Sequence, residues 1–430
     1  MEDRIVVFWF RRDLRLHDNT GLSKALQSGY KVLPIFIFDD NILDGLPKND
    51  ARITFIYDSL KAVNNELIKE DTNLLIQKGS PLKVWKEIIA KFSVAEVYFN
   101  HDYEPYGIKR DQEIRAYLTS KNIVCNTFKD QVIFEKNEVL KKDGTPYTVF
   151  TPYKSKWLQL FNRDIHTQEQ VTEVYFKNFI KNHTDFPELS NLGFNRSKIT
   201  VKPYSLLSLS RYEETRNFPF KDTTSYLSPY LRFGIVSIRK MVTFALQTNE
   251  TFLSELIWRE FFMQILYHYP KVLTESFKKK YDVIPWRNNI EEFNKWCNGE
   301  TGYPLVDAGM RELNQTGYMH NRVRMVVASF LCKHLLIDWR WGEAYFAKKL
   351  LDFELASNNG NWQWAAGTGC DAAPYFRVFN PTEQLKKFDK ELKYTQKWVT
   401  NLNEFSYPPP MVDHKLARER AINTYKKALQ

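Results

Sequence analysis

The chain has 430 residues, enough for two or three domains that each bury a hydrophobic core. Its content of 43% apolar and 26% charged residues is typical of a globular protein. The net charge of +10 favours a polyanionic partner such as nucleic acid, although a lysine-rich surface gives the same sum. No apolar run approaches the roughly 18 residues of a membrane span, and the first residues show no signal-peptide pattern. We therefore expect a cytoplasmic protein with no membrane partner.

The first 130 residues alternate short apolar runs with helical patterns. We expect strands at Ile5–Phe10, Val32–Phe38, Leu74–Gln77, Glu96–Asn100 and Ile123–Phe128, and helices at Ala51–Glu70, Pro81–Phe92 and Gly107–Thr119. This alternation predicts a doubly wound parallel sheet of the Rossmann-like α/β class. The GxGxxG fingerprint of a nicotinamide-binding domain does not follow the first strand.

The rest of the chain changes character. Residues 131–204 are polar and mixed, and we interpret them as a connector between domains. From residue 205 to 430 helical patterns dominate, at Ile235–Gln247, Phe252–His268, Ile290–Asn298, Tyr303–Gln315, Asn321–Leu336 and Gly342–Leu351. The sequence thus predicts domains at 1–130 and 205–430, the second of them all-helical.

Cysteine usage argues against a metal centre. The four cysteines, Cys125, Cys297, Cys332 and Cys370, are scattered and form no CxxC pair or Cys/His cluster. We expect reduced, structural thiols and no bound metal.

One segment stands apart from the helical pattern. Asp352–Asp389 combines acids, adjacent asparagines, two tryptophans and a Gly-rich turn, and no simple helix or strand pattern explains it. A polar and aromatic run inside an apolar-rich domain indicates the lining for a large flat ligand.

This segment resembles the flavin- and substrate-contacting part of the photolyase/cryptochrome family. The opening string RRDLRLHDN, Arg11–Asn19, is a second long and unusual match, and the matches run from about residue 4 to residue 420. The resemblance implies FAD in the helical domain. Its contacts would be Tyr212, Thr224, Ser225, Tyr226, Leu227, Ser228, Arg259, Arg324, Asp352, Glu354 and Asn358.

The same resemblance implies a pocket for damaged DNA. Glu255, Asn321 and Met325 would contact the lesion, with Trp258 and Trp364 as aromatic walls. The segment Glu255–Phe262 places Glu255, Trp258 and Phe262 on one helix face, and an Asn suits a base edge. Lys154, Arg322 and Arg377 would contact DNA phosphates. For the pair Arg324–Asp352, an ordinary salt bridge between helices is the alternative.

Tryptophans are concentrated late in the chain, with eight of the eleven after residue 250. A Trp-rich core accounts for that count without any further role. The resemblance implies that Trp362, Trp339 and Trp286 carry electrons from the protein surface to the flavin, while Asn358 faces the reactive flavin nitrogen as a neutral amide.

Within the family, the combination of Glu255, Trp258, Asn321, Met325 and Trp364 looks like class I cyclobutane pyrimidine dimer (CPD) photolyases. Enzymes for the (6-4) photoproduct need histidines at the positions of Asn321 and Met325. We therefore expect light-driven repair of DNA that contains these dimers, by a monomer associated with the nucleoid. The alternatives are a cryptochrome-type photoreceptor without repair and, less compatible with the missing GxGxxG, a nicotinamide-dependent flavoprotein.

A second, light-harvesting chromophore stays open. Folate-using relatives carry an Asn-Glu pair where this chain has Tyr106 and Gly107. The sequence therefore does not favour a folate at that place. A deazaflavin, another flavin or no antenna are the alternative interpretations.

Overall fold

The computed structural model describes residues 4–430. The chain forms two compact units. The N-terminal unit comprises residues up to 138 together with 160–202 and 227–247, and the C-terminal unit comprises 139–159, 203–226 and 248–430. The division into 1–130, 131–204 and 205–430 that we expected from the sequence stays a prediction. The two compact units are defined by contacts between residues, and such contacts do not test which segments fold independently.

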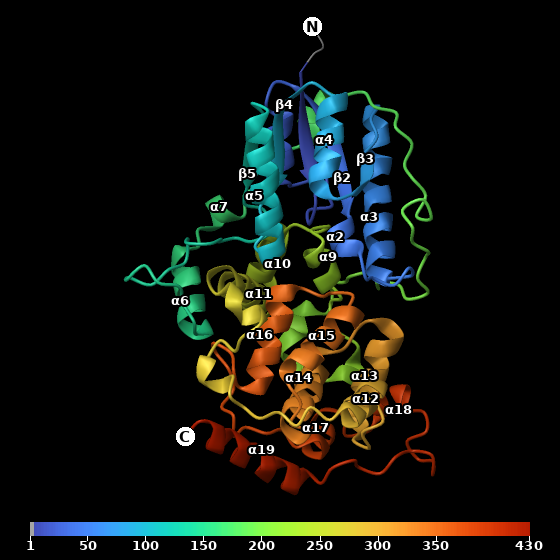
Figure 1. Ribbon diagram of the computed structural model, residues 1–430, viewed down its shortest axis with the longest axis vertical. Coiled ribbons are helices and arrows are strands. Elements are labelled where there is room, and N and C mark those ends of the chain that lie inside the picture. The colour runs from blue at the N-terminus through green and yellow to red at the C-terminus, as the bar shows by residue number, and fades with distance from the viewer. Residues whose placement is uncertain (1–3) are drawn as a thin grey trace. The chain divides into compact units, whose positions relative to one another are not determined.

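The N-terminal unit contains a five-stranded parallel sheet in the order β3-β2-β1-β4-β5 (Figure 1). Its strands are β1 Ile5–Phe10, β2 Lys31–Asp39, β3 Leu75–Gly79, β4 Val94–Asn100 and β5 Val124–Phe128. Its main helices are α1 Thr20–Leu26, α2 Asp40–Leu43, α3 Ala51–Leu67, α4 Pro81–Lys91, α5 Pro105–Ser120, α7 Arg163–His166, α9 Ser228–Arg232 and α10 Ile238–Thr248. The predicted doubly wound sheet is confirmed, whereas the short helices α1 and α2 were not expected.

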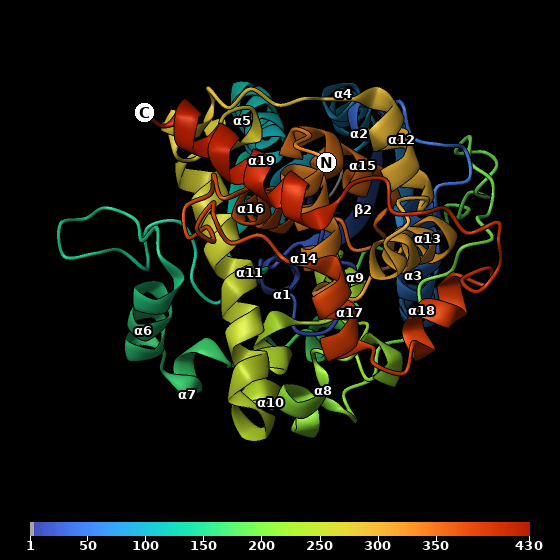
Figure 2. The same cartoon turned by 90° about the horizontal axis from the view of Figure 1, so that it is seen from below.

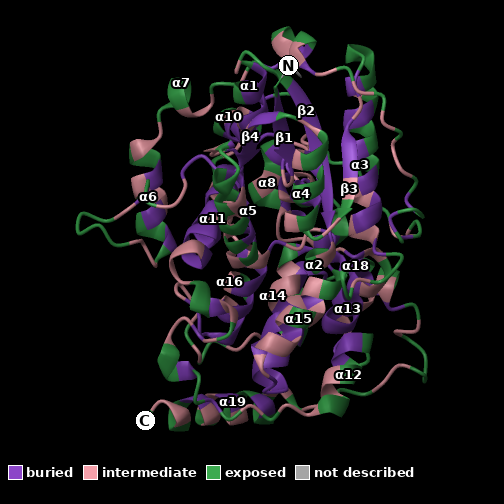
Figure 3. Ribbon diagram, turned by 45° about the horizontal axis from the view of Figure 1, so that its top comes forward, coloured by how far each residue is buried: buried purple, intermediate pink, exposed green. Residues whose placement is uncertain are grey.

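Both faces of the sheet are buried, as the continuous apolar strands predicted (Figure 3). Along β1, alternate side chains enter two different cores. Val6, Phe8 and Phe10 pack with residues of α1 and α3, while Ile5, Val7 and Trp9 pack with residues of α4 and α5. Helices on both faces therefore follow from the strand pattern.

The RRDLRLHDN string builds a buried ionic network rather than a simple basic turn. Asp18 accepts hydrogen bonds from Arg239 on α10, and Asp130 accepts from both Arg15 and Arg239. Each carboxylate is almost fully buried, at 2% and 1% exposure, so each needs its guanidinium partner. The network ties α10 to the loops that follow β1 and β5, within the N-terminal unit.

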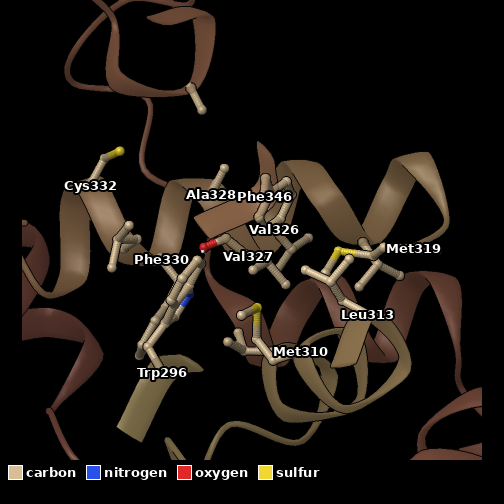
Figure 4. Packing of buried hydrophobic residues seen from close by; sticks show 14 of the residues in the cluster. Trp296, Met310, Leu313, Met319, Val326, Val327, Ala328, Phe330, Cys332 and Phe346 are labelled. Atoms are coloured by element: carbon tan, nitrogen blue, oxygen red, sulfur yellow. Dashed lines mark hydrogen bonds between the residues drawn. The ribbon is translucent and has the colours of Figure 1, made fainter. Parts of the chain in front are cut away.

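The C-terminal unit is helical, as predicted (Figure 2). Its longer helices are α6 Phe150–Leu160, α11 Glu250–His268, α12 Ile290–Asn298, α13 Pro304–Thr316, α14 Asn321–Ser329, α15 Trp339–Lys349, α16 Leu355–Ala366, α17 Pro381–Phe388 and α19 His414–Ala428; α8 Tyr212–Thr215 and α18 Lys393–Trp398 are shorter. The main core lies between α12, α13, α14, α15 and α16. Trp296 of α12 is fully buried there and donates its indole N–H to the Val327 carbonyl, 3.2 Å away (Figure 4).

The helix predicted over Asn321–Leu336 is a regular α-helix only as far as Ser329. It continues past Ser329 as a π-helical turn, Phe330–His334, closed by a hydrogen bond from Leu335 N to Phe330 O. This wider turn carries the buried Lys333, whose Nζ donates to the Ala366 carbonyl at 2.7 Å. A hydrophobic period alone does not distinguish a π-turn from a regular helix.

The expectation that no regular pattern fits the segment from Asp352 was wrong for its first part, because Leu355–Ala366 forms α16. Asn, Gly and Trp have low helix propensity, and this helix is buried on several sides. Tertiary bonds stabilise it instead: Asn359 and Gln363 both donate to the Val272 carbonyl. Gly360 is required because a Cβ there would lie 2.2 Å from the Phe262 ring.

The polar stretch 131–204 also contains a helix that the sequence did not reveal. α6 begins at Phe150, shortly after an exposed turn closed by a hydrogen bond from Lys141 N to Thr145 O; this turn projects outward in both cartoon views (Figures 1 and 2). No helix among residues 4–430 is long and apolar enough to cross a membrane.

Candidate active site

A pocket opens in the C-terminal unit between α14, α15 and α16. It contains about 620 Å³ of space, part of it open to solvent. Eight of the residues singled out from the sequence line it: Asn321, Arg324, Met325, Asp352, Glu354, Asn358, Trp362 and Trp364. The sequence therefore located a real cavity, although its members lie on three separate segments.

α14 presents three of these side chains because of how it begins. His320 caps the helix by accepting a hydrogen bond from Arg322 N, and burial lowers the pKa of its imidazole to about 4. A neutral capping imidazole is a structural role. With the helix beginning here, Arg324 and Met325 lie one helical turn after Asn321, and all three side chains are on the face that lines the pocket.

Arg324 and Asp352 form an ion pair in the pocket wall. The guanidinium Nη2 donates to both carboxylate oxygens, at 3.0 and 3.2 Å, and Nε donates to the Met319 carbonyl. Burial alone would lower the pKa of Arg324, but the adjacent Asp352 raises it. The Arg324 guanidinium is thus held in its charged form at the edge of the cavity.

The side-chain amide of Asn358 uses its nitrogen within the protein and leaves its oxygen for the pocket. Its Nδ2 donates to the side chain of Glu343 at 2.7 Å and to the Glu343 carbonyl at 3.1 Å. Because the nitrogen is used in this way, the amide oxygen is the atom left to accept a hydrogen from a ligand. Burial raises the pKa of Glu343, while the bond from Asn358 opposes that shift.

Glu255 and Trp258 lie on α11 and are half-buried. They do not line the pocket described above, but each has a defined partner. Glu255 pairs with Arg216 at 2.7 Å, and Trp258 stacks on Phe150 with ring centroids 3.7 Å apart. Burial raises the pKa of the Glu255 carboxyl, and the nearby Arg216 offsets only part of that rise.

Three guanidinium groups influence one another near this helix. Burial lowers the pKa of Arg322, and the positive charges of Arg216 and Arg377 lower it further. Arg322 donates to Asn217 through Nη2, while its buried Nε has no hydrogen-bond partner among residues 4–430. Such a group of cations suits a phosphate. Arg216 was missed from the sequence because its proximity to Arg322 depends on tertiary folding.

The remaining expected contacts are dispersed. Lys154 donates to Ser254 at 2.6 Å, and Arg259 and Tyr212 are half-buried on α11 and α8. Thr224, Ser225 and Tyr226 form a loop of the C-terminal unit, whereas Leu227 and Ser228 begin the stretch that belongs to the N-terminal unit. Tyr226 has φ of +52°, which is unusual for an aromatic residue, and its ring packs on Tyr318 at 4.8 Å. A strained residue of this kind is common where a loop contacts a ligand.

The three tryptophans of the expected relay differ in exposure. Trp362 and Trp339 are buried, and Trp286 is half-buried beside Tyr425, with ring centroids 5.9 Å apart. Trp362 also touches Phe346 and Trp296, at centroid distances of 5.0 and 6.2 Å. From Trp296 a further aromatic path runs through Phe293 to the half-buried Trp341. The structure thus shows one chain of ring contacts from Trp362 to Trp341, while the relay through Trp339 and Trp286 stays a prediction.

Comparison with known proteins decides the family. Residues 6–173 match the family model described as DNA photolyase, and residues 252–406 match the FAD binding domain of DNA photolyase. The chain belongs to the DNA photolyase family. A relative from Vibrio cholerae named deoxyribodipyrimidine photo-lyase is 35% identical over 98% of this chain and 99% of its own length.

Solved structures agree with the architecture. A bacterial class III photolyase from Agrobacterium tumefaciens superposes with a TM-score of 0.88 at 33% identity, over 100% of this chain and 98% of that one. An archaeal photolyase from Sulfolobus tokodaii, solved with two FAD molecules, gives a TM-score of 0.85 at 34% identity, over 98% and 99%. The predicted two-part fold and the predicted family are confirmed.

The pocket residues fit FAD. The matched FAD-binding region includes all of the pocket-lining residues from Asn321 to Ala365. A cavity with apolar walls, a charged pair at its edge and one buried amide oxygen can bind a flat ring that has both hydrogen-bond donors and acceptors.

Proposed function

We propose that this chain is a DNA repair enzyme that uses light to split cyclobutane pyrimidine dimers. One observation supports it most: the pocket that combines Asn321, Met325 and Trp364 with the Arg324–Asp352 pair and Asn358 lies in the region that matches the photolyase FAD domain. The chain matches its Vibrio cholerae photo-lyase relative over nearly the full length of both.

FAD is the cofactor, and the residues of the C-terminal unit that would hold it are those of the pocket. When bound, reduced FAD excited by light supplies an electron to the dimer, which splits and returns it. Asn358 would accept a hydrogen from the flavin ring while bringing no negative charge near it. Tyr212, Thr224–Ser228, Arg259 and Glu354 would complete the contacts, the hydroxyl and backbone groups facing the phosphates.

The dimer must leave the duplex to reach such a pocket. Asn321 offers a donor and an acceptor to a pyrimidine edge, Met325 offers soft contact, and Trp364 and Trp258 offer stacking surfaces. Glu255, held by Arg216, would accept hydrogens from the bases. Arg322 and Arg377, with Lys154, would bind the phosphates that flank the extruded nucleotides.

A second chromophore belongs to the proposal without an assigned identity. At the position of the folate-type Asn-Glu pair, the Tyr106 hydroxyl donates to Asp39 at 2.6 Å, and a Cβ on Gly107 would lie 2.5 Å from the Asp102 side chain. Residue 107 is a glycine in the first turn of α5, so this position offers no carboxylate. A folate bound through that pair is thus disfavoured, and a deazaflavin, another flavin or no antenna are the alternatives. The enzyme would act in the cytoplasm as a monomer on nucleoid DNA.

The experiment is repair of a defined lesion. Purified protein should carry about one FAD per chain and, once reduced, convert thymine dimers in an oligonucleotide to thymines under blue light but not in the dark. Bleaching of the flavin by NADH in the dark would instead indicate a nicotinamide-dependent flavoprotein.

A further inference from the structure

Phe150 forms a close aromatic stack within the C-terminal unit. Its ring lies almost parallel to the indole of Trp258, with 3.7 Å between centroids and an interplanar angle of 9°. Phe150 itself is 8% exposed, whereas Trp258 is half-buried. The Phe150 ring therefore covers one face of Trp258. Phe262 packs against the same indole at 5.3 Å and 31°, and the part of the indole that stays exposed is available to a ligand.

The position of Phe150 is fixed from the side of α6. Glu260 on α11 accepts hydrogen bonds from Trp157 Nε1 at 2.6 Å and from the Tyr153 hydroxyl at 3.3 Å. Lys154 adds a bond to Ser254, also on α11. Three residues of α6 thus bind α11 on either side of Trp258 in the sequence, and α6 cannot shift without breaking buried bonds.

Phe150 is fixed a second time through its own backbone. As the first residue of α6 it has an N–H that no helical carbonyl can accept, and this N–H donates to the Asp371 carboxylate at 3.1 Å. Asp371 lies in the loop between α16 and α17, a few residues before Arg377. The stack is therefore held by three segments: the start of α6, α11 and this loop.

We propose that Phe150 is a positioning residue for dimer recognition: it holds the indole of Trp258 in the one orientation that stacks on an extruded pyrimidine. This inference rests on the proposed function, because it gives Trp258 the role of a base platform. Phe261 and Phe262 also touch the indole, but the near-parallel Phe150 ring covers one face and fixes the plane of the indole. A partly exposed indole without that stack can populate more rotamers, and binding must then select one of them. The Phe150 ring removes that cost before the DNA arrives.

The test compares binding in the dark to matched oligonucleotides with and without a thymine dimer, using FAD-containing protein. Phe150→Leu keeps an apolar side chain but removes the flat ring. We expect affinity for the dimer to fall about 2- to 10-fold, the range expected for loss of an aromatic pair. Affinity for undamaged DNA, FAD content and repair yield per absorbed photon at saturating DNA should be unchanged. Phe150→Tyr keeps the ring and should restore dimer affinity.

Phe261→Leu is the matched control. Phe261 is fully buried and meets both Trp258 and Phe150 edge-on, at 5.5 Å and 80° and at 5.8 Å and 72°, without stacking on the face of either ring. This variant should therefore lower thermal stability without altering the preference for the dimer. If Phe150→Leu loses FAD, Asp371→Ala gives the second test, because it frees the Phe150 backbone and should weaken dimer binding in the same direction.

Two results would overturn the inference: unchanged dimer affinity in Phe150→Leu, or an equal loss for damaged and undamaged DNA. The second result would make Phe150 a packing residue only. A wild-type protein that does not prefer dimers at all would instead contradict the proposed function, so the two failures are distinct.

Discussion

At the scale of single residues, charge and stacking are set by neighbours that the sequence does not reveal. Glu255 is held by Arg216, Trp258 by Phe150 and Asn358 by Glu343. In each pair the sequence pointed to the first member, because its residue type suits a base or a flavin. The second member comes from another element, so only the folded chain identifies it.

Trp258→Ala should weaken binding to dimer-containing DNA about 5- to 150-fold, since loss of a stacked base contact costs roughly 1–3 kcal/mol. FAD content should stay normal, because Trp258 does not line the pocket. Filter binding or fluorescence anisotropy with both oligonucleotides measures the change. Equal losses for damaged and undamaged DNA would place Trp258 in the core or on a nonspecific surface.

At the scale of elements, the sheet was predictable and the site helix was not. Continuous apolar strands alternating with amphipathic helices predicted every strand of the sheet, with β1 at its correct limits. α16 was not predicted because its Asn, Gly and Trp residues have low helix propensity. The hydrogen bonds to the Val272 carbonyl that stabilise it involve a distant segment of the chain. α6 was not predicted because it lies in a polar stretch and buries only three large side chains. Local propensity fails where tertiary contacts decide the conformation.

The electron relay depends on three segments, and Trp286→Phe tests its outer end. We expect this variant to lose light-driven reduction of oxidised FAD by an external thiol, while repair by protein already reduced with dithionite stays near wild type. Repair passes the electron between flavin and dimer only. Absorbance at the flavin band during illumination follows the reduction.

Trp341→Phe is the matched control for that relay, because Trp341 is the half-buried end of the second aromatic path. It should leave photoreduction intact. If Trp341→Phe lost photoreduction while Trp286→Phe kept it, the outer electron donor would be Trp341. Our assignment of Trp286 would then be wrong.

At the scale of the whole molecule, a buried carboxyl makes stability depend on pH. Glu312 of α13 is 9% exposed and accepts the Tyr394 hydroxyl at 2.6 Å. Burial raises the pKa of its carboxyl from 4.5 to about 7. A carboxyl whose pKa is raised by folding stabilises the native state in its protonated form. That contribution is complete below about pH 4.5 and is lost as the pH rises through about 7.

Glu312→Gln keeps the acceptor for Tyr394 and removes the titration. At pH 8 the variant should be more stable than wild type by roughly 1–3 kcal/mol, and the advantage should disappear near pH 4.5. Denaturant unfolding at both pH values measures it. Glu391→Gln, an exposed position beside Lys393, is the control and should change neither curve. An equal gain at both pH values would show that Glu312 does not titrate as proposed.

The most direct measurement of the proposed function follows dimers in one sample of pre-reduced, FAD-containing protein. An oligonucleotide with a single thymine dimer is bound in the dark, illuminated with short blue flashes, and analysed by chromatography after each flash. We predict a stepwise conversion of dimer to thymines in the light, none in the dark, and a slower approach to saturation with DNA concentration in Trp258→Ala. An unchanged dimer under light, with FAD present and reduced, would contradict repair and favour a photoreceptor of the cryptochrome type.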